Sequence, residues 1–319
     1  MQKFKNLFVF MLIFIVLFSF VGCGREMEDE YNTNTTTFQE QDNVILNTTE
    51  ENTTENTTSR KPKDQVTLED IIAYAIESAG DIQNYDLDLN INSGMSYLGF
   101  PITYTSVTTG SAFAEPMKMM TKTTAVVRNV STTNSEYYIE TIGDKVYIYS
   151  RTNNEEWEKQ EIGVGNASDQ FNVMQMVSSC LNSIENMSIS DDEVNGISAY
   201  KIQGIVSGQS MENIVNQSGL INNMSGLGGN ADIDMTGVYQ GLQDMSITLW
   251  IDEDSYYPLQ YAMDMSEISS RILERMKAAG TAPNAAMLSN LRIRTFDTLT
   301  TLKNFNNASD FQVPSDARS

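Results

Sequence analysis

The sequence predicts an α+β fold: an antiparallel sheet of roughly eleven strands, with an N-terminal helix and inserted helices. Three observations support this prediction. Segments in which apolar and polar residues alternate recur through most of the chain. The loops between many of them are shorter than the dozen or more residues that a parallel crossover needs, so neighbouring strands must be antiparallel. Segments with helical periodicity are few, which excludes the regular alternation of a doubly wound sheet.

The first structured element is a helix over 66–80. Thr67 and Asp70 resemble a capping box at its start, and Gly80 is a typical stop signal. Between them, apolar residues recur at the spacing of one helix face. They are Leu68, Ile71, Ile72, Ala75, Ile76 and Ala79. A helix with one apolar face must pack against another element, and predicted strands follow it directly.

An antiparallel meander of six strands comes next. The predicted strands are 85–92, 102–109, 117–127, 136–142, 145–150 and 157–162. In the first, Leu87, Leu89 and Ile91 alternate with Asp and Asn residues, the period of a strand with one solvated face. Turn signals such as Asn153-Asn154 separate the strands. An aromatic band is expected to pack across the neighbouring strands. It comprises Tyr137, Tyr138, Tyr147, Tyr149 and Trp157.

The second half of the chain adds five strands and three helices. The strands are 187–191, 199–206, 245–251, 259–265 and 291–302, and the helices are 168–185, 209–218 and 267–279. Asn195-Gly196 is the strongest hairpin signal in the chain. Apolar neighbours on the helix around Cys180 predict a buried thiol. The glycine-containing segment 219–236 is interpreted as a mobile flap and not as a phosphate loop, because no Gly-Lys-Ser/Thr follows it.

The first residues predict where the protein works. Lys3 and Lys5 precede an apolar run that is too short and wrongly flanked for a spanning helix, so 1–22 is interpreted as a secretory signal. Val21-Gly22-Cys23 resembles the lipobox of bacterial lipoproteins, although Phe20 stands where the family usually has Leu. This resemblance implies a diacylglycerol on the thiol of Cys23. The expected location is the extracytoplasmic face of the cell membrane, lipid-anchored, in a Gram-positive bacterium.

The rest of the domain organisation follows from composition. The segment 23–65 begins with the lipidated cysteine and continues as an Asn-, Thr- and Glu-rich stretch with almost no apolar spacing. Such a segment cannot bury enough surface to offset its ordering entropy, so a disordered tether is expected. The folded domain is predicted to span 66–319.

Charge narrows the possible partners. The 319 residues include 42 acidic and 20 basic side chains, a formal net charge of −22. This excess disfavours nucleic-acid binding through a basic surface, and it also opposes binding to anionic headgroups. Membrane contact is therefore expected through the N-terminal lipid, since two acyl chains suffice for stable anchoring. Any protein partner is unknown at this stage.

The residue inventory argues against an enzyme. The chain contains no His, which removes Ser-His-Asp and Cys-His catalysis and imidazole ligands for zinc. No catalytic, cofactor-binding or metal-binding residues are predicted. Asp252-Glu253-Asp254 resembles the opening of a calcium loop, but Tyr257 and Met263 stand where that loop needs Gly and Glu, so a hairpin turn is expected. A glycosidase with two carboxylates stays open as an alternative, because its two residues can lie anywhere in a sequence.

The order of elements resembles the LolA/LppX class of half-barrel lipoproteins and lipid carriers. Three phrases also look like uncharacterised clostridial lipoproteins of that shape: Lys145-Val146-Tyr147-Ile148-Tyr149 before Trp157, Leu249-Trp250-Ile251-Asp252 before Pro258, and Asn304-Phe305-Asn306 before Val313-Pro314. The resemblance spans most of Val66 to Ala317, with motifs of low specificity. It implies that the antiparallel sheet of roughly eleven strands is curved into a half-barrel, with the N-terminal helix and the inserted helices on its concave face. These helices would form a lid over a cavity for acyl chains, and no catalytic residues are implied.

Two hypotheses about function follow. The first is a lipoprotein that binds a lipid or other hydrophobic ligand. The residues expected to line its cavity are Leu87, Leu89, Ile91, Met119, Met174, Ile247, Leu249, Tyr261 and Met263. The chain's 18 methionines favour this hypothesis, because Met adapts to irregular apolar partners, although they could equally fill an ordinary core. The second hypothesis is a structural or interaction lipoprotein that binds a partner protein or cell-wall polymer and has no ligand cavity.

Overall fold

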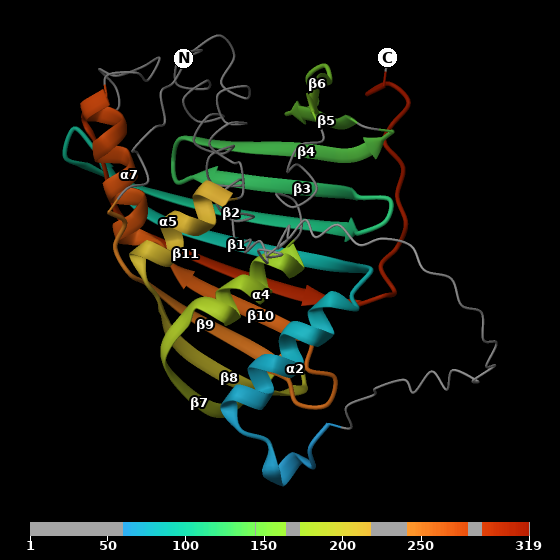
Figure 1. Cartoon of the computed structure of the whole chain (residues 1–319). Coiled ribbons are helices and arrows are strands. Elements are labelled where there is room, and N and C mark those ends of the chain that lie inside the picture. The colour runs from blue at the N-terminus through green and yellow to red at the C-terminus, as the bar shows by residue number, and fades with distance from the viewer. Residues whose placement is uncertain (1–59, 144, 164–172, 218–240, 280–288, 319) are drawn as a thin grey trace, which may run out of the picture. The chain divides into compact units, whose positions relative to one another are not determined.

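The computed structural model describes residues 60–318, with the exception of Asp144, 164–172, 218–240 and 280–288. Its folded unit begins at Leu68, and its described part contains one sheet of eleven strands (Figure 1). The strands are β1 (Asn84–Tyr97), β2 (Phe100–Phe113), β3 (Lys118–Val127), β4 (Ser131–Ile142), β5 (Lys145–Thr152), β6 (Glu158–Gly163), β7 (Ile184–Val194), β8 (Ile197–Val206), β9 (Met245–Asp252), β10 (Pro258–Asp264) and β11 (Leu291–Lys303).

The sheet is antiparallel and open. Its strand order is β6-β5-β4-β3-β2-β1-β11-β10-β9-β8-β7, so β6 and β7 are the two edges. Two meanders, β1 to β6 and β7 to β11, are therefore joined in the middle by pairing of β1 with the last strand, for example Leu89 with Thr300. This confirms the predicted fold class, an α+β half-barrel built on an antiparallel sheet. The pairing of β1 with β11 depends on contacts across two hundred residues and could not be read from local pattern.

The turns follow the predicted signals. Asn195 and Gly196, with φ of 53° and 85°, form the two-residue turn between β7 and β8. Asn153 and Asn154, which follow β5, also have positive φ, at 52° and 60°. Asn and Gly tolerate this left-handed region at little cost, and two such residues in succession match the right-handed twist of paired strands.

Four helices are seen in the described residues of the folded unit: α2 (Leu68–Gly80), α4 (Val173–Ser183), α5 (Gly208–Gln217) and α7 (Ser266–Ala279). Figure 1 shows α2, α4 and α5 in front of the sheet and α7 beside the strand ends, where α7 packs on β11. Helix α2 packs against α4. It is also tied to the turn after β9, because Ser78 Oγ donates a 3.0 Å hydrogen bond to the carbonyl oxygen of Ser255 and the ring of Tyr74 packs edge-on against Tyr256.

Some boundaries differ from prediction. The helix expected to reach residue 185 ends at Ser183, and Ile184 already belongs to β7. Asn186, with φ of 52°, cannot continue a helix, and the β7 register shifts at this point. Within the expected tether, Lys63–Gln65 form a short 3-10 turn. The predicted signal, Cys23, most of the tether and the flap at 219–236 lie outside the described residues.

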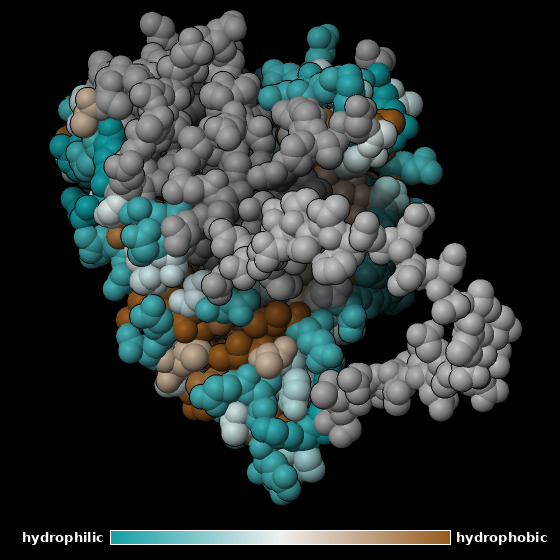
Figure 2. Space-filling view, viewed as in Figure 1, coloured by the Kyte–Doolittle hydropathy of each residue, from teal (hydrophilic) through white to brown (hydrophobic). Residues whose placement is uncertain are grey.

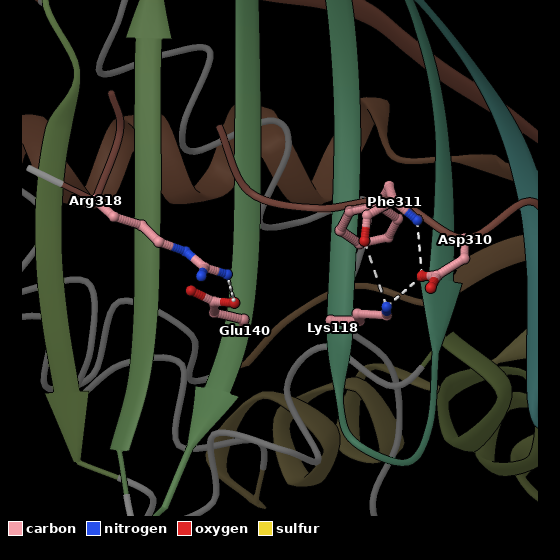
Figure 3. A network of polar contacts seen from close by, with 5 residues as sticks. All are labelled: Lys118, Glu140, Asp310, Phe311 and Arg318. Carbon is pink, nitrogen blue, oxygen red and sulfur yellow. Dashed lines mark hydrogen bonds and ion pairs between the residues drawn. The ribbon is translucent and has the colours of Figure 1, made fainter. Parts of the chain in front are cut away.

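The C-terminal segment, 304–318, runs along the sheet face opposite to the one that carries Leu89 (Figure 3). The segment first contacts the start of β1, where the backbone N–H of Asn306 donates a 2.7 Å hydrogen bond to the carbonyl oxygen of Asn84. Lys118 on β3 then pairs with Asp310, and Nη2 of Arg318 donates a 2.7 Å hydrogen bond to Glu140 on β4. The sequence alone did not predict any role for this segment.

Four of the five residues of the predicted aromatic band form the apolar contacts beneath that segment. The fifth, Tyr137, lies opposite Thr121 on the other face of the sheet and does not belong to the band. Val313 and Ala317 pack in one buried cluster with Tyr138 and Tyr149, and the ring of Trp157 meets Tyr138 edge-on with centroids 5.7 Å apart. The band therefore packs side chains together across β4 and β5, as expected, and it also holds the end of the chain.

Candidate functional site

The register of the sheet places most of the predicted lining residues in two adjacent rows on the same face. In one row, Leu249 of β9 lies opposite Tyr261 of β10, which lies opposite Thr300 of β11 and then Leu89 of β1. The neighbouring row contains Ile247, Met263, Thr298 and Ile91 in the same order. Residues directly opposite each other on paired strands share a face and touch. Side chains more than 150 residues apart thus form one continuous surface.

All nine predicted lining residues are buried, with exposed fractions between 1% and 5%. Leu87 adjoins the two rows on β1, and Met174 is buried on α4. Met119 belongs to the same face but lies apart from the others, because it pairs with Ala112 of β2 and Ile139 of β4. The structure therefore brings seven of the nine into the two rows and the adjoining position on β1. Whether they line a ligand cavity stays a prediction.

Helix α4 covers this part of the face. The Cys180 thiol of α4 lies close enough to Tyr261 to affect the pKa of the phenol, and both side chains are buried. Figure 2 shows apolar side chains gathered around α4 and the β7 to β9 end of the sheet. Burial of Cys180 was expected from its apolar helical neighbours.

Beyond β1, the same two rows change from apolar to hydroxyl side chains. The row of Leu89 continues through Thr108, Thr123 and Ser135, and the row of Ile91 continues through Ser106. All four of these hydroxyl residues are buried. Thr108 and Thr123 satisfy each other, with their Oγ1 atoms 2.8 Å apart, and Ser135 lies 3.3 Å from Thr152 by the hydroxyl oxygens. The face is therefore amphipathic along its width.

At the border between the two halves, some hydroxyl groups are buried without a hydrogen bond of standard geometry. They are those of Ser106, Thr298 and Thr300. Ser106 and Thr300 nevertheless lie beside the phenols of Tyr104 and Tyr261, close enough for a side-chain hydrogen bond to lower the pKa of each phenol against the larger effect of burial. A buried hydroxyl that makes no hydrogen bond costs about 1–3 kcal/mol relative to one that does. Such groups are uncommon in native proteins and call for an explanation, and one explanation is a role in hydrogen bonding to a ligand. Thr298 is the clearest case, since its neighbours in the row are Met263 and Ile91.

The site is electrically neutral. From β8 to β4 the two rows hold no Asp, Glu, Lys or Arg side chain. Burial raises the pKa of Tyr261 well above its usual value of 10, and burial likewise raises the pKa of Tyr104 to about 12. Both phenols are therefore protonated at neutral pH. The surface can accommodate alkyl chains over one half and form neutral hydrogen bonds over the other, but it supplies no charge.

Sequence reasoning identified the apolar half of this face and missed the hydroxyl half. Its signal is present in the sequence, because Ser106 and Thr108 occupy alternate positions of one strand and Thr121 and Thr123 do so in the next. Alternating Ser and Thr were not assigned to either face, since these residues suit a solvated face equally well.

The described residues do not form a metal site or a membrane-spanning helix. Among the described residues, no group of three or more His, Cys, Asp or Glu side chains is placed to hold a metal ion. The carboxylate of Asp252, considered above as part of a calcium loop, instead accepts hydrogen bonds from the backbone N–H groups of Asp254 and Ser255 and so closes the hairpin between β9 and β10. In the part of the chain that the structure describes, no helix is long and apolar enough to cross a membrane.

Comparison with known proteins assigns the chain to a family. Residues 67–319 match DUF6612, described as a family of unknown function, and the protein belongs to that family. Among solved structures, it is similar to LprF from Mycobacterium bovis, at 12% sequence identity and a TM-score of 0.42 over 76% of this chain and 95% of that chain. It is also similar to a DUF1329 family protein from Desulfovibrio piger, at 9% identity and a TM-score of 0.24 over 76% and 94%. A search of curated proteins found no match.

Proposed function

We propose that this protein is a membrane-anchored extracytoplasmic lipoprotein that binds a lipid or other hydrophobic ligand and does not catalyse a reaction. The observation that supports this most is the amphipathic sheet face under α4, with alkyl side chains such as Leu249 and Met263 on one half and buried hydroxyl groups on the other. A ligand that has both an alkyl part and a neutral polar part matches both halves.

The apolar half would supply the affinity. Burial of apolar surface contributes about 25 cal/mol per Å², so a single acyl chain laid along Leu249, Tyr261 and Leu89 would gain several kcal/mol. The polar half would select among ligands. A hydroxyl or carbonyl group of the ligand near Thr298 would satisfy a buried group that the protein itself leaves without a hydrogen bond.

Membrane attachment rests on the sequence. The lipobox-like Val21-Gly22-Cys23 and the polar segment after it support an N-terminal lipid and a location outside the cytoplasm. The full chain should then fractionate with membranes. Its Cys23→Ser variant should be released from them or retain its signal, and mass spectrometry of the N-terminal peptide would identify the lipid. A wild-type chain that carries no lipid on Cys23 would contradict the anchor.

The ligand is tested on residues 24–319, which contain every strand of the sheet and lack the secretory signal and Cys23. This chain is purified without detergent, and native mass spectrometry followed by organic extraction identifies any bound lipid. We expect a co-purifying lipid that is recovered chemically unchanged. A ligand-free mass that stays constant after incubation with vesicles of membrane lipid would contradict the proposal and favour a structural or interaction lipoprotein.

A pair of variants on one strand locates the site. Leu249→Gln places an amide on the proposed ligand face, whereas Thr248→Gln places the same amide on the opposite face of β9. Leu249→Gln should lower the fraction of protein that carries lipid, and Thr248→Gln should not. Circular dichroism of both variants controls for loss of folding. Equal lipid content in the two variants would show that the ligand lies elsewhere.

A further inference from the structure

One end of the sheet exposes large apolar side chains at two turns. Leu98 and Phe100 lie at the turn between β1 and β2, with exposed fractions of 58% and 73%. Val130, at the turn between β3 and β4, is 65% exposed. Large apolar residues are common on protein surfaces singly, but a group of them at the tips of neighbouring turns marks a contact surface.

These turns lie at the same end of the molecule. In an antiparallel meander, alternate turns fall on the same side, and the pairing of β2 with β3 ends at Tyr104 and Val127, next to both turns. The segment before β11 lies at this end too, beside the turn between β1 and β2, because Leu98 N donates a hydrogen bond to the carbonyl oxygen of Asn290 at 3.2 Å. Figure 1 shows both turns at the left end of the strands, the end at which α7 lies.

The same end is basic, although the chain as a whole is strongly acidic. The three segments that form it, 96–104, 127–135 and 289–296, contain Arg128, Arg292 and Arg294 and no Asp or Glu. All three arginines are exposed. Arg292 forms an ion pair with Glu274, whose Oε1 lies 3.7 Å from Arg292 Nη1. Both side chains are over half exposed, so this pair contributes little. The formal net charge of −22 therefore hides a local basic surface.

We propose that this end of the sheet, formed by Leu98, Phe100, Val130 and the three arginines, docks on an anionic lipid bilayer. Apolar tips can enter the interface between headgroups and acyl chains, and guanidinium groups beside them pair with lipid phosphates. The acidic remainder of the molecule is repelled by the same surface, so the charge distribution selects one orientation. The N-terminal anchor would keep the chain near the bilayer, and this surface would set which end faces it. The inference does not depend on a ligand in the sheet face.

Vesicle co-sedimentation of residues 24–319 tests the proposal without the contribution of a lipid anchor. The probes are vesicles of phosphatidylcholine and vesicles of phosphatidylcholine mixed with phosphatidylglycerol. We expect binding to the mixed vesicles, weaker binding at high salt, and little binding to phosphatidylcholine alone. Replacing the arginines together, as R128Q/R292Q/R294Q, should lower partitioning about fivefold per arginine. The variant L98S/F100S/V130S should lower it on the mixed vesicles as well.

Matched controls change the same chemistry elsewhere. I142S/I197S replaces apolar residues that are 51% and 44% exposed at the opposite end of the sheet, and K122Q/K145Q/K159Q removes three exposed charges away from the proposed surface. Both should bind like the unchanged chain. The proposal would be overturned if the wild-type protein did not bind the vesicles that contain phosphatidylglycerol. It would also be overturned if the control variants lost as much binding as R128Q/R292Q/R294Q and L98S/F100S/V130S. Native mass spectrometry of the same variants measures ligand binding separately from vesicle binding. None of the replaced residues belongs to the two rows of the proposed ligand face, so these variants should keep their ligand even where they lose vesicle binding.

Discussion

Arg318 reaches back across 178 residues of sequence to donate a 2.7 Å hydrogen bond to the Oε2 atom of Glu140 on β4. The other oxygen of that carboxylate, Oε1, accepts a 3.0 Å hydrogen bond from the hydroxyl of Tyr149 on β5. Burial of the phenol and, as the next cause, this shared carboxylate raise the pKa of Tyr149 to about 12. The end of the chain is thus bound to the middle of one meander, on the face opposite the candidate site.

The apolar part of the C-terminal segment should matter more than its ion pair. Val313→Ala removes buried alkyl groups packed on Tyr138 and is expected to lower the free energy of unfolding by about 2 kcal/mol. Arg318→Gln removes a half-exposed guanidinium from Glu140, whose carboxylate keeps its hydrogen bond from Tyr149, and should cost less than about 1 kcal/mol. Urea unfolding of the two variants measures both values. If Arg318→Gln proved the costlier change, the segment would be held by charge and not by packing.

The sequence predicted the strands because each one carries its own evidence. Leu87, Leu89 and Ile91 alternate with polar residues whatever β1 pairs with, so the eleven strands and most of the apolar residues of the candidate site could be assigned locally. The C-terminal segment could not, since it has no periodicity and is held by partners such as Asn84 and Glu140 that lie far away in sequence. The basic end was missed for a related reason: the net charge averages over the chain, while Arg128 and Arg292 come to the same end only in the folded sheet.

A pair of glycines should respond in opposite directions to the same substitution. A Cβ on Gly208, the first residue of α5, would lie 1.8 Å from the carbonyl oxygen of Leu242, which is backbone and cannot move aside easily. Gly208→Ala is therefore expected to lower stability by roughly 3 kcal/mol. Around Gly80, at the end of α2, a Cβ meets nothing within 4 Å, and Gly80→Ala should raise stability by about 0.5–1 kcal/mol through the unfolded state.

Thermal unfolding of both variants tests this packing. A Gly208→Ala protein with an unchanged Tm would show that α5 does not approach Leu242 as closely as described.

The Asp192 carboxylate should contribute stability that is lost in acid. A 3.0 Å hydrogen bond from Trp250 Nε1 is the largest cause, followed by one from the backbone N–H of Glu193 and by Lys201, and together they lower the pKa of Asp192 from 3.8 to about 2. Because the folded pKa lies below the unfolded one, the stabilisation is fully present above about pH 4. It disappears as the pH falls through about 2.

The prediction is measured as the difference in Tm between the wild type and Asp192→Asn. That difference should favour the wild type at pH 6 and shrink towards zero as the pH approaches 2. Asp191→Asn, on the same strand but outside these hydrogen bonds, is the matched control and should show no comparable trend. A difference that grew on acidification would have the wrong sign and would exclude the proposed linkage.

Thr298 should behave unlike a threonine whose hydroxyl is satisfied by the protein. In ligand-free protein, Thr298→Val removes a buried hydroxyl that lacks a standard hydrogen bond, and the free energy of unfolding should rise by about 1 kcal/mol. Thr108→Val breaks the 2.8 Å contact with Thr123 and leaves that hydroxyl buried alone, so it should cost about 2 kcal/mol. The two substitutions are chemically identical and lie on the same sheet face, so only their partners differ.

For a ligand whose hydroxyl or carbonyl group bonds to Thr298, Thr298→Val should also weaken binding by up to about tenfold, because one hydrogen bond is lost. Urea unfolding after removal of bound lipid, together with titration of the lipid identified by mass spectrometry, gives both quantities. A Thr298→Val protein that is as unstable as Thr108→Val would show that the Thr298 hydroxyl already has a partner within the protein, and the polar half of the site would then belong to the fold and not to a ligand.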